Sequence, residues 1–139
     1  MKADTLTWPL KVLNELLDET RAASGSAARL ILSGAPAALD PGVELAAYRI
    51  VQEALTNARR HAPGAGIDVE LHYSHDALHV RIRDTGPGPP GAAGAAGHGL
   101  LGMRERAAAV GGELRTGSAP GGGFLVQATL PTKTEEVVK

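Results

Sequence analysis

Two neighbouring segments with alternating apolar and polar residues constrain the fold of this chain more than any other feature of its sequence. Residues 67–73 and residues 78–83 each carry an apolar side chain at every second position. This period of two is typical of strands that bury one face and leave the other in water. Residues 74–77 between them are enough for a turn, so the sequence predicts an antiparallel hairpin.

Helical patterns precede the hairpin. Residues 9–23 carry leucines at helical spacing, and residues 28–32 form a short, mostly apolar run that is typical of a strand. Asp40 followed by Pro41 predicts the start of a second helix, because aspartate is a favoured N-cap and proline suits the first helical position. We expect this helix to end near residue 62, where Pro-Gly follows.

Glycine is abundant after the hairpin. Residues 86–97 consist of glycine, alanine and proline alone, which predicts a long mobile loop. Residues 100–110 are predicted to be helical, and residues 113–116 and 124–130 to form a last pair of strands. The whole pattern indicates one α+β domain, a two-layer sandwich with helices on one face of a mainly antiparallel sheet.

Composition excludes several classes of function. The net charge of −1 and the small number of aromatic residues argue against nucleic acid as a partner. The chain has no cysteine, which excludes disulfides and cysteine zinc sites and fits a reducing cytoplasm. No apolar run approaches the roughly 20 residues that span a bilayer, so we expect no direct membrane contact.

One edge of the second helix combines four polar side chains. Glu53, Asn57, Arg60 and His61 fall on a wedge of the helix surface beside its apolar stripe. Amide and carboxylate oxygens suit Mg²⁺, and arginine and histidine suit phosphate oxygens. The alternative is an ordinary solvated helix face.

A second group follows the hairpin directly. Asp84, Gly86 and Gly88 have the spacing D-x-G-x-G at a strand end. An aspartate there could accept a hydrogen bond from an exocyclic amine, and the glycines would let the backbone pass close to a flat ligand. The alternative is a simple turn, in which Asp and Gly are common for conformational reasons.

The third group, residues 97–102, matches G-x-G-x-x-G. A dinucleotide-binding fold is excluded, because no strand precedes the motif and no acidic residue follows at the required distance. What remains is a glycine-rich start of a helix near Gly99, whose free N–H groups suit an anion, or a plain loop-to-helix junction. No lysine lies between Lys11 and Lys133, so a P-loop is also excluded.

Taken in order, these motifs resemble those of sensor histidine kinases. Residues 52–57 with residues 60–62 resemble the N-box, and residues 84–88 resemble the first glycine box. Residues 97–106 resemble the second glycine box with its helix, and residues 121–131 resemble the closing strand. The resemblance is strongest to the branch that pairs with response regulators of the NarL type.

The resemblance implies the Bergerat (GHKL) ATP-binding fold, which gyrase, a heat-shock chaperone family and mismatch-repair ATPases share. In that fold the nucleotide lies between helices and a mixed, mostly antiparallel sheet, under a lid. Here the lid would be rich in glycine and alanine and would run from Pro89 to about His98. The cofactors implied are ATP and Mg²⁺.

Position by position, the resemblance implies that Asn57 binds Mg²⁺ and that Glu53 has a catalytic role beside the metal. It also implies that Asp84 accepts a hydrogen bond from the adenine amine. Phosphate contacts would come from the helix, base contacts from the first glycine box, and further contacts from the second box and the last strand. These additional nucleotide positions are Arg60, His61, Gly86, Gly88, Gly97, His98, Gly99, Leu100 and Thr129.

The resemblance also implies a division of labour. Residues 1–27 would be a helix and linker on the side of a dimerisation domain, residues 28–131 the ATP-binding catalytic domain, and residues 132–139 a tail. None of the histidines lies in a helix that resembles the acceptor segment, so the acceptor histidine is expected on a separate dimerisation domain.

We therefore expect a cytoplasmic histidine kinase domain that transfers the γ-phosphoryl group of ATP to that histidine, for relay to a NarL-type response regulator. Whether the parent kinase is anchored in a membrane stays open. The alternatives are a serine kinase of the anti-sigma type and a non-catalytic nucleotide-sensing module of the same fold.

Overall fold

The computed structural model describes residues 11–35, 38–86 and 94–132, with the backbone alone for residues 94–99. The elements are α2 (Val12–Ser24), β1 (Ala28–Gly34), α3 (Pro41–His61), β2 (Ile67–Tyr73), β3 (Ala77–Asp84), α4 (Gly94–Ala109), β4 (Glu113–Ser118) and β5 (Phe124–Pro131).

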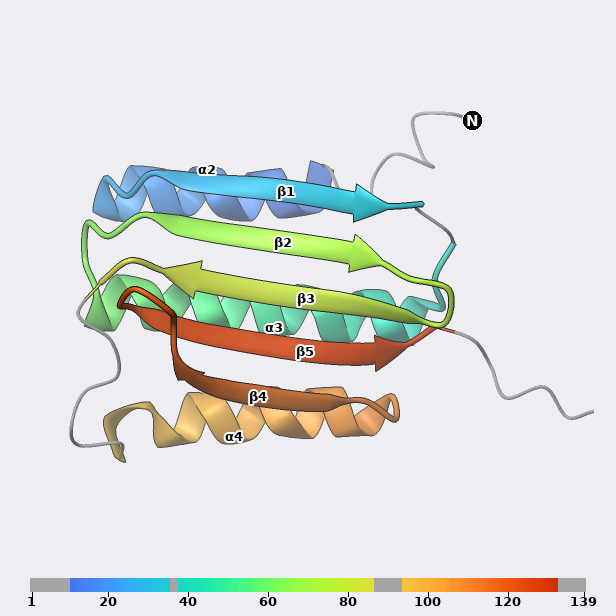
Figure 1. Ribbon diagram of the computed structural model, residues 1–139. Coiled ribbons are helices and arrows are strands. Elements are labelled where there is room, and N and C mark those ends of the chain that lie inside the picture. Colours follow the sequence, from blue (N-terminus) through green and yellow to red (C-terminus); the bar gives the residue numbers. More distant parts are fainter. Residues whose placement is uncertain (1–10, 36–37, 87–93, 133–139) are drawn as a thin grey trace, which may run out of the picture.

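The strands form one five-stranded sheet in the order β1-β2-β3-β5-β4. The pair β1/β2 is parallel and the other pairs are antiparallel, so the predicted hairpin β2/β3 is confirmed within a mixed sheet. All three described helices lie behind the same face of the sheet, and the other face is open (Figure 1). The predicted two-layer α+β architecture is confirmed.

Strand alternation builds the core between these layers. In β2 and β3 the apolar positions are buried and the polar positions between them are not, as their period predicts. Fully buried side chains from three helices and three strands meet in one cluster, whose largest members include Leu13, Leu17, Ile50, Ile67, Leu71, Leu78, Met103 and Leu130.

Helix α2 belongs to this same core. Its residues Leu13 and Leu17 are fully buried, and Leu16 is nearly so. The side chain of Arg21 donates to the carbonyl oxygen of Ala28 through Nε (3.1 Å) and Nη2 (2.6 Å), which ties the helix to the start of β1. The predicted boundary after residue 27 therefore does not coincide with an edge of the core.

Helix α3 begins at Pro41 and ends at His61, within one residue of the predicted limits. Asp40 is the N-cap residue, but its side chain makes no capping hydrogen bond. Instead its carbonyl oxygen accepts from the N–H groups of Val43 (3.0 Å) and Glu44 (3.1 Å). The basic last turn of α3 is favourable at the negative end of the helix dipole.

The start of α4 differs from the prediction. The helix begins at Gly94 rather than near residue 100, so residues 94–98 of the expected lid are helical. Alanine is the best helix former, and once a helix exists each added residue gains a hydrogen bond. The glycines in this run suggested a loop, but the alanines between them extend the helix. The earlier part of the expected lid, residues 89–93, lies outside the described residues.

One ion pair joins β1 to β2 on the open face. Arg29 donates to Asp68 through Nε to Oδ1 (2.9 Å) and through Nη2 to Oδ2 (3.1 Å), a bidentate arrangement. These hydrogen bonds hold the pKa of Asp68 below its usual value; partial burial opposes the shift, and the charges of Arg29 and Arg83 reinforce it.

Candidate functional site

The predicted site residues of α3 and β3 that the structure describes lie toward one end of the sheet. Strand β3 ends there and β5 begins there, and the C-terminal turn of α3 and the N-terminal turn of α4 lie behind them (Figure 1). Four segments that are far apart in the sequence therefore surround this end of the molecule.

Asp84 is the buried carboxylate at the end of β3, with 7% of its surface exposed. Its Oδ1 accepts hydrogen bonds from the backbone N–H groups of Gly86 (2.8 Å) and Phe124 (3.3 Å). Its Oδ2 accepts none from the residues that the structure describes. The carboxylate is thus held by the backbone and keeps one oxygen that can accept a hydrogen bond from a ligand, such as one with an amine group.

Glycine is required at two positions around this carboxylate. A Cβ atom on Gly86 would lie 2.4 Å from the Cβ of Ala62, at the end of α3. A Cβ on Gly123 would lie 1.9 Å from the carbonyl oxygen of Asp84, and Gly123 has φ +99°. Because a side chain cannot fit in either place, the backbone of the first glycine box packs directly against α3 and against β5.

The strand end is also tied to the loop that follows α3. The N–H of Thr85 donates to the carbonyl oxygen of Gly66 (3.0 Å), and the N–H of Gly66 donates to Thr85 Oγ1 (3.0 Å). This reciprocal pair fixes the backbone beyond Asp84 and so limits how far the carboxylate can move.

The polar wedge of α3 divides into buried and accessible members. Asn57 is buried with 5% of its surface exposed, Glu53 and His61 are half-buried, and Arg60 is exposed. Asn57 Nδ2 and His61 Nε2 are both shielded from solvent and find no hydrogen-bond partner in the described part of the chain. Buried polar atoms without partners are rare in folded proteins, so these two atoms mark a place where a ligand would complete the hydrogen bonding.

A magnesium ion fits this wedge with one protein ligand. Among the described residues no group of three or more His, Cys, Asp or Glu side chains could hold a metal ion. Mg²⁺ commonly keeps several waters and binds through few protein oxygens together with substrate phosphates. The amide of Asn57 makes no hydrogen bond with the described residues, and its oxygen and nitrogen can exchange places by a flip of the group, so it suits this role.

Of the second glycine box, the structure describes residues 97–99 by their backbone alone and the residues from Leu100 onward in full. The backbone of Gly97, His98 and Gly99 lies inside α4, and Leu100 is half-buried and packs against the core. A helix start near Gly99 is therefore wrong, and the N–H groups of Gly99 and Leu100 are committed to the helix. Gly88 of the first box lies outside the described residues.

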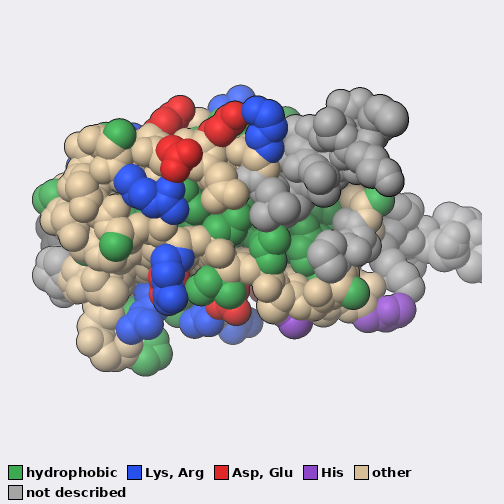
Figure 2. Space-filling view, turned by 90° about the horizontal axis from the view of Figure 1, so that it is seen from above, with side chains coloured by type: hydrophobic (Ala, Val, Ile, Leu, Met, Phe, Trp, Pro, Cys, Tyr) green, Lys and Arg blue, Asp and Glu red, His purple; other side chains and the backbone are tan. Residues whose placement is uncertain are grey.

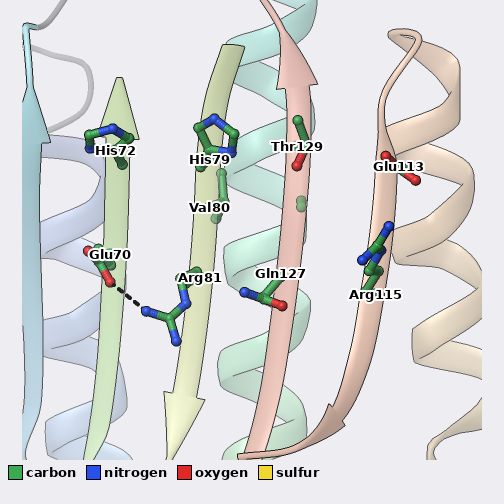
Figure 3. Close-up of a pocket in the computed structure, with 10 residues that line it drawn as sticks. Glu70, His72, His79, Val80, Arg81, Glu113, Arg115, Gln127 and Thr129 are labelled. Carbon is green, nitrogen blue, oxygen red and sulfur yellow. Dashed lines mark hydrogen bonds and ion pairs between the residues drawn. The ribbon is translucent and has the colours of Figure 1, made fainter. Parts of the chain in front are cut away.

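Thr129 does not join the other predicted residues. It pairs with His79 of β3 and Glu113 of β4, and its side chain lies on the open face of the sheet (Figure 3). Asp84 lies on the helix-covered face, because it alternates with His79, Arg81 and Arg83 along β3. The expectation that Thr129 reaches the pocket of Asp84 is wrong, because the sheet separates the two side chains.

Comparison with known proteins agrees with this arrangement. Residues 42–134, well over half of the chain, match the family described as "Histidine kinase-, DNA gyrase B-, and HSP90-like ATPase". The chain belongs to this ATPase family. The match covers every residue of the site around Asp84 and begins at the start of α3.

Individual relatives of this ATPase domain are sensor kinases. The chain is 37% identical over 119 residues to "Sensor histidine kinase LnrJ" of Bacillus subtilis (strain 168), covering 86% of this chain and 29% of that protein. It is 36% identical over 96 residues to "Sensor protein VraS" of Staphylococcus epidermidis, covering 68% of this chain and 28% of that protein. The chain thus spans less than a third of these relatives.

Solved structures share the fold of the ATPase domain. The mycobacterial sensor histidine kinase MprB superposes with a TM-score of 0.66 at 20% identity, covering 90% of this chain and 96% of that one. The Acinetobacter baumannii histidine kinase AdeS gives a TM-score of 0.72 at 15% identity, covering 89% and 64%. In the ATPase domain itself, no helix among the described residues is long and apolar enough to cross a bilayer.

Three contributors to the site of this ATPase domain were missed by sequence reasoning. Phe124 supplies a backbone N–H to Asp84, Gly123 allows that approach, and Ala62 packs where Gly86 has no side chain. The run of glycines before residue 124 was a signal for Gly123, although it was interpreted only as the lead into the closing strand. No local pattern indicates the other two, because a backbone donor and a methyl group have no signature of their own.

Proposed function

We propose that this domain binds ATP at the Asp84 end of the sheet and is the catalytic domain of a sensor histidine kinase. The observation that carries the proposal is the Asp84 carboxylate, which is buried, held through Oδ1 by two backbone N–H groups and free at Oδ2. Such an acceptor can bind the exocyclic amine of a flat base, because the neighbouring glycine has no side chain to keep the base away from the backbone. The family match and the sensor-kinase names of the relatives support the same function.

Each residue of the site has a role in this proposal. Oδ2 of Asp84 accepts a hydrogen bond from the adenine amine, and Gly86 borders the ring. Asn57 and His61, whose buried nitrogens have no partner among the described residues, meet the metal and phosphate end of the nucleotide. When bound, Mg²⁺ would offset the negative charge of the phosphates, with Asn57 as its protein ligand and Glu53 beside it.

Transfer of the phosphoryl group requires a second domain. The acceptor imidazole nitrogen attacks the γ-phosphorus, the bond from that phosphorus to the β–γ bridging oxygen breaks, and ADP leaves. Positioning and charge neutralisation do most of the catalysis in such reactions, so the task of this domain is to hold ATP in place. Arg60, which is exposed, would contact phosphate oxygens from the solvent side.

The remaining parts of the proposal concern the parent protein. The acceptor histidine belongs to a dimerisation domain joined through residues 1–27, and the phosphoryl group passes on to a response regulator of the NarL type. Residues 28–131 carry the ATP-binding site, with α2 packed on the same core, residues 132–139 make a tail, and the domain works in the cytoplasm.

Calorimetric titration with ADP and with a non-hydrolysable ATP analogue, each with and without Mg²⁺, tests the nucleotide site. The titrations use the unmodified chain, Asp84→Asn and the control Asp76→Asn, which changes an exposed carboxylate in the hairpin turn. We expect binding that strengthens with Mg²⁺, collapses in Asp84→Asn and persists in Asp76→Asn. Absence of binding at millimolar nucleotide would contradict the proposal.

A second experiment distinguishes the kinase from its alternatives. The domain is incubated with labelled ATP and a histidine-containing dimerisation domain supplied as a separate chain. Acid-labile, base-stable label on that partner supports the histidine kinase. Label on serine of a protein partner would instead support a kinase of the anti-sigma type, and nucleotide binding without any transfer would support a sensing module.

A further inference from the structure

The open face of the sheet carries a depression of about 500 Å³. Its lining includes Glu70 of β2, Arg81 of β3, Gln127 and Thr129 of β5, and Glu113 and Arg115 of β4 (Figure 3). The sheet separates it from the proposed ATP site, because Asp84 lies on the opposite face. Its volume is within the range of small-molecule sites, which is roughly 300–1,000 Å³.

Strand register brings the polar side chains of this depression together. Arg81 pairs with Glu70 on one side and with Gln127 on the other, and Gln127 pairs with Arg115. These residues form one row across the sheet, with the two arginines on either side of Gln127 (Figure 3). Their backbones are two strand spacings apart, roughly 10 Å, which long arginine side chains can bridge around a bound group.

Several donors in this row are not used by the protein. Arg81 reaches Glu70 through a single contact, Nη1 to Oε1 at 3.2 Å, and its Nε is shielded from solvent without a partner among the described residues. Arg115 makes no ion pair or hydrogen bond within the described part of the chain, although Glu113 lies two positions away on the same strand face. The amide of Gln127 is equally without a partner among the residues described.

The open face carries both arginine and carboxylate side chains, and the depression itself is lined by Arg81 and Arg115 beside Glu70 and Glu113. Seen from the β1 edge, the border of this face shows Lys/Arg side chains with Asp/Glu among them, and histidine side chains (Figure 2). Arginine side chains bind carboxylate and phosphate groups through paired hydrogen bonds. Arg81, which Glu70 holds by one contact, and Arg115, which has no partner among the described residues, are therefore suitable donors for such a group.

We propose that this depression binds the oxyanion group, a carboxylate or a phosphate, of a small molecule. The group lies between Arg81 and Arg115, with the amide of Gln127 and the hydroxyl of Thr129 as further donors. Glu70 competes with the ligand for Arg81, so it weakens binding. The site is independent of the proposed ATP site and can be occupied while nucleotide is bound.

The test follows the side-chain amide of Gln127 and the Nε–H groups of arginine by NMR in the ¹⁵N-labelled full chain. Inorganic phosphate and, separately, succinate are titrated in at constant ionic strength, with and without ADP. The variants are Arg81→Gln, Arg115→Gln and Glu70→Gln. The control is Arg104→Gln, which removes the same charge from an exposed position of α4. The backbone spectrum of each variant reports whether it is folded.

We expect saturable shifts at Gln127 and Arg115 that persist with ADP bound. Removing either guanidinium should weaken binding by at least about fivefold, whereas Glu70→Gln should tighten it and Arg104→Gln should leave it unchanged. A response to phosphate alone or to succinate alone supports the site and identifies the ligand class. No shift at Gln127 with either anion, or equal weakening in Arg104→Gln, would overturn the proposal.

Discussion

The carboxylate of Asp84 accepts a hydrogen bond from the backbone N–H of Phe124, 3.3 Å away and 40 residues further along the chain. This bond joins the end of β3 to the start of β5, the two strands that pair side by side in the sheet. It orients the carboxylate from the sheet side, while the N–H of Gly86 holds the same oxygen from the loop side at 2.8 Å. The free oxygen is therefore directed by the backbone rather than by other side chains.

Replacing Asp84 with asparagine should lower the affinity for ADP by about 10- to 100-fold, roughly 1–3 kcal/mol, while the domain stays folded. The amide oxygen can still accept from the backbone, but the amide nitrogen then faces the adenine amine, and two donors cannot pair. Calorimetry measures the affinity, and circular dichroism checks that the variant is folded. Unchanged affinity in Asp84→Asn would remove the adenine assignment.

A methyl group at Gly86 should disrupt the contact between the first glycine box and α3. In Gly86→Ala the new Cβ would lie 2.4 Å from the Cβ of Ala62, so we expect a loss of about 1–3 kcal/mol in unfolding free energy, with weaker nucleotide binding. Urea unfolding measures the first effect. The double variant with Ala62→Gly should recover part of the loss, and no recovery would mean that another contact causes it.

Substitution of Asn57 by alanine should separate stability from function. The change removes a buried amide nitrogen without a described partner and introduces a better helix former, so the melting temperature should stay the same or rise. The gain in ADP affinity on addition of Mg²⁺ should disappear. Thr56→Ala, at the neighbouring position whose hydroxyl donates to the Gln52 carbonyl of the same helix, is the control. If Asn57→Ala weakens adenosine binding as much as it weakens Mg²⁺-dependent ADP binding, the result would contradict a metal role for Asn57.

Loss of the Thr129 hydroxyl should leave nucleotide binding unchanged. Thr129 lies on the open face of the sheet, away from Asp84, so Thr129→Ala removes no group from the nucleotide site. Calorimetry with ADP on this variant, beside Asp84→Asn, tests the difference between the two faces. A substantial drop in affinity would mean that the nucleotide site extends through the edge of the sheet.

Acid should weaken the fold partly through Asp68. Its pKa in the folded protein lies below the usual value of 3.8, so its contribution to stability is present above that value and is lost as the pH falls through the lowered folded pKa. Asp68→Asn should lower the melting temperature at neutral pH by at most about 3 °C, since the side chains of Arg29 and Asp68 are 68% and 33% exposed and water screens the pair.

The same variant should show a smaller fall in melting temperature on acidification than the unmodified chain. Thermal unfolding followed by circular dichroism over the acid range measures this. Asp76→Asn is the matched control, and an identical pH dependence in Asp68→Asn would show that the ion pair contributes nothing.

Much of the fold could be predicted because local patterns determine it. The alternation in residues 67–73 and 78–83 predicts both strands and which of their side chains are buried, and Asp40-Pro41 predicts the start of α3 within one residue. The start of α4 could not be predicted in this way. Alternating glycine and alanine have opposing helix preferences, and extension of an existing helix decided the outcome.

By itself the sequence determined the period of each strand, the order of the three polar motifs and the placement of Asn57 on a helix and Asp84 at a strand end. The tertiary structure decided what these residues meet. Pairing of β3 with β5 brings the Phe124 N–H to Asp84, packing of α3 brings Ala62 against Gly86, and the sheet places Thr129 on the other side. Periodicity is a property of neighbouring residues, whereas these contacts join backbone and methyl groups that are distant in the chain and carry no pattern in the sequence.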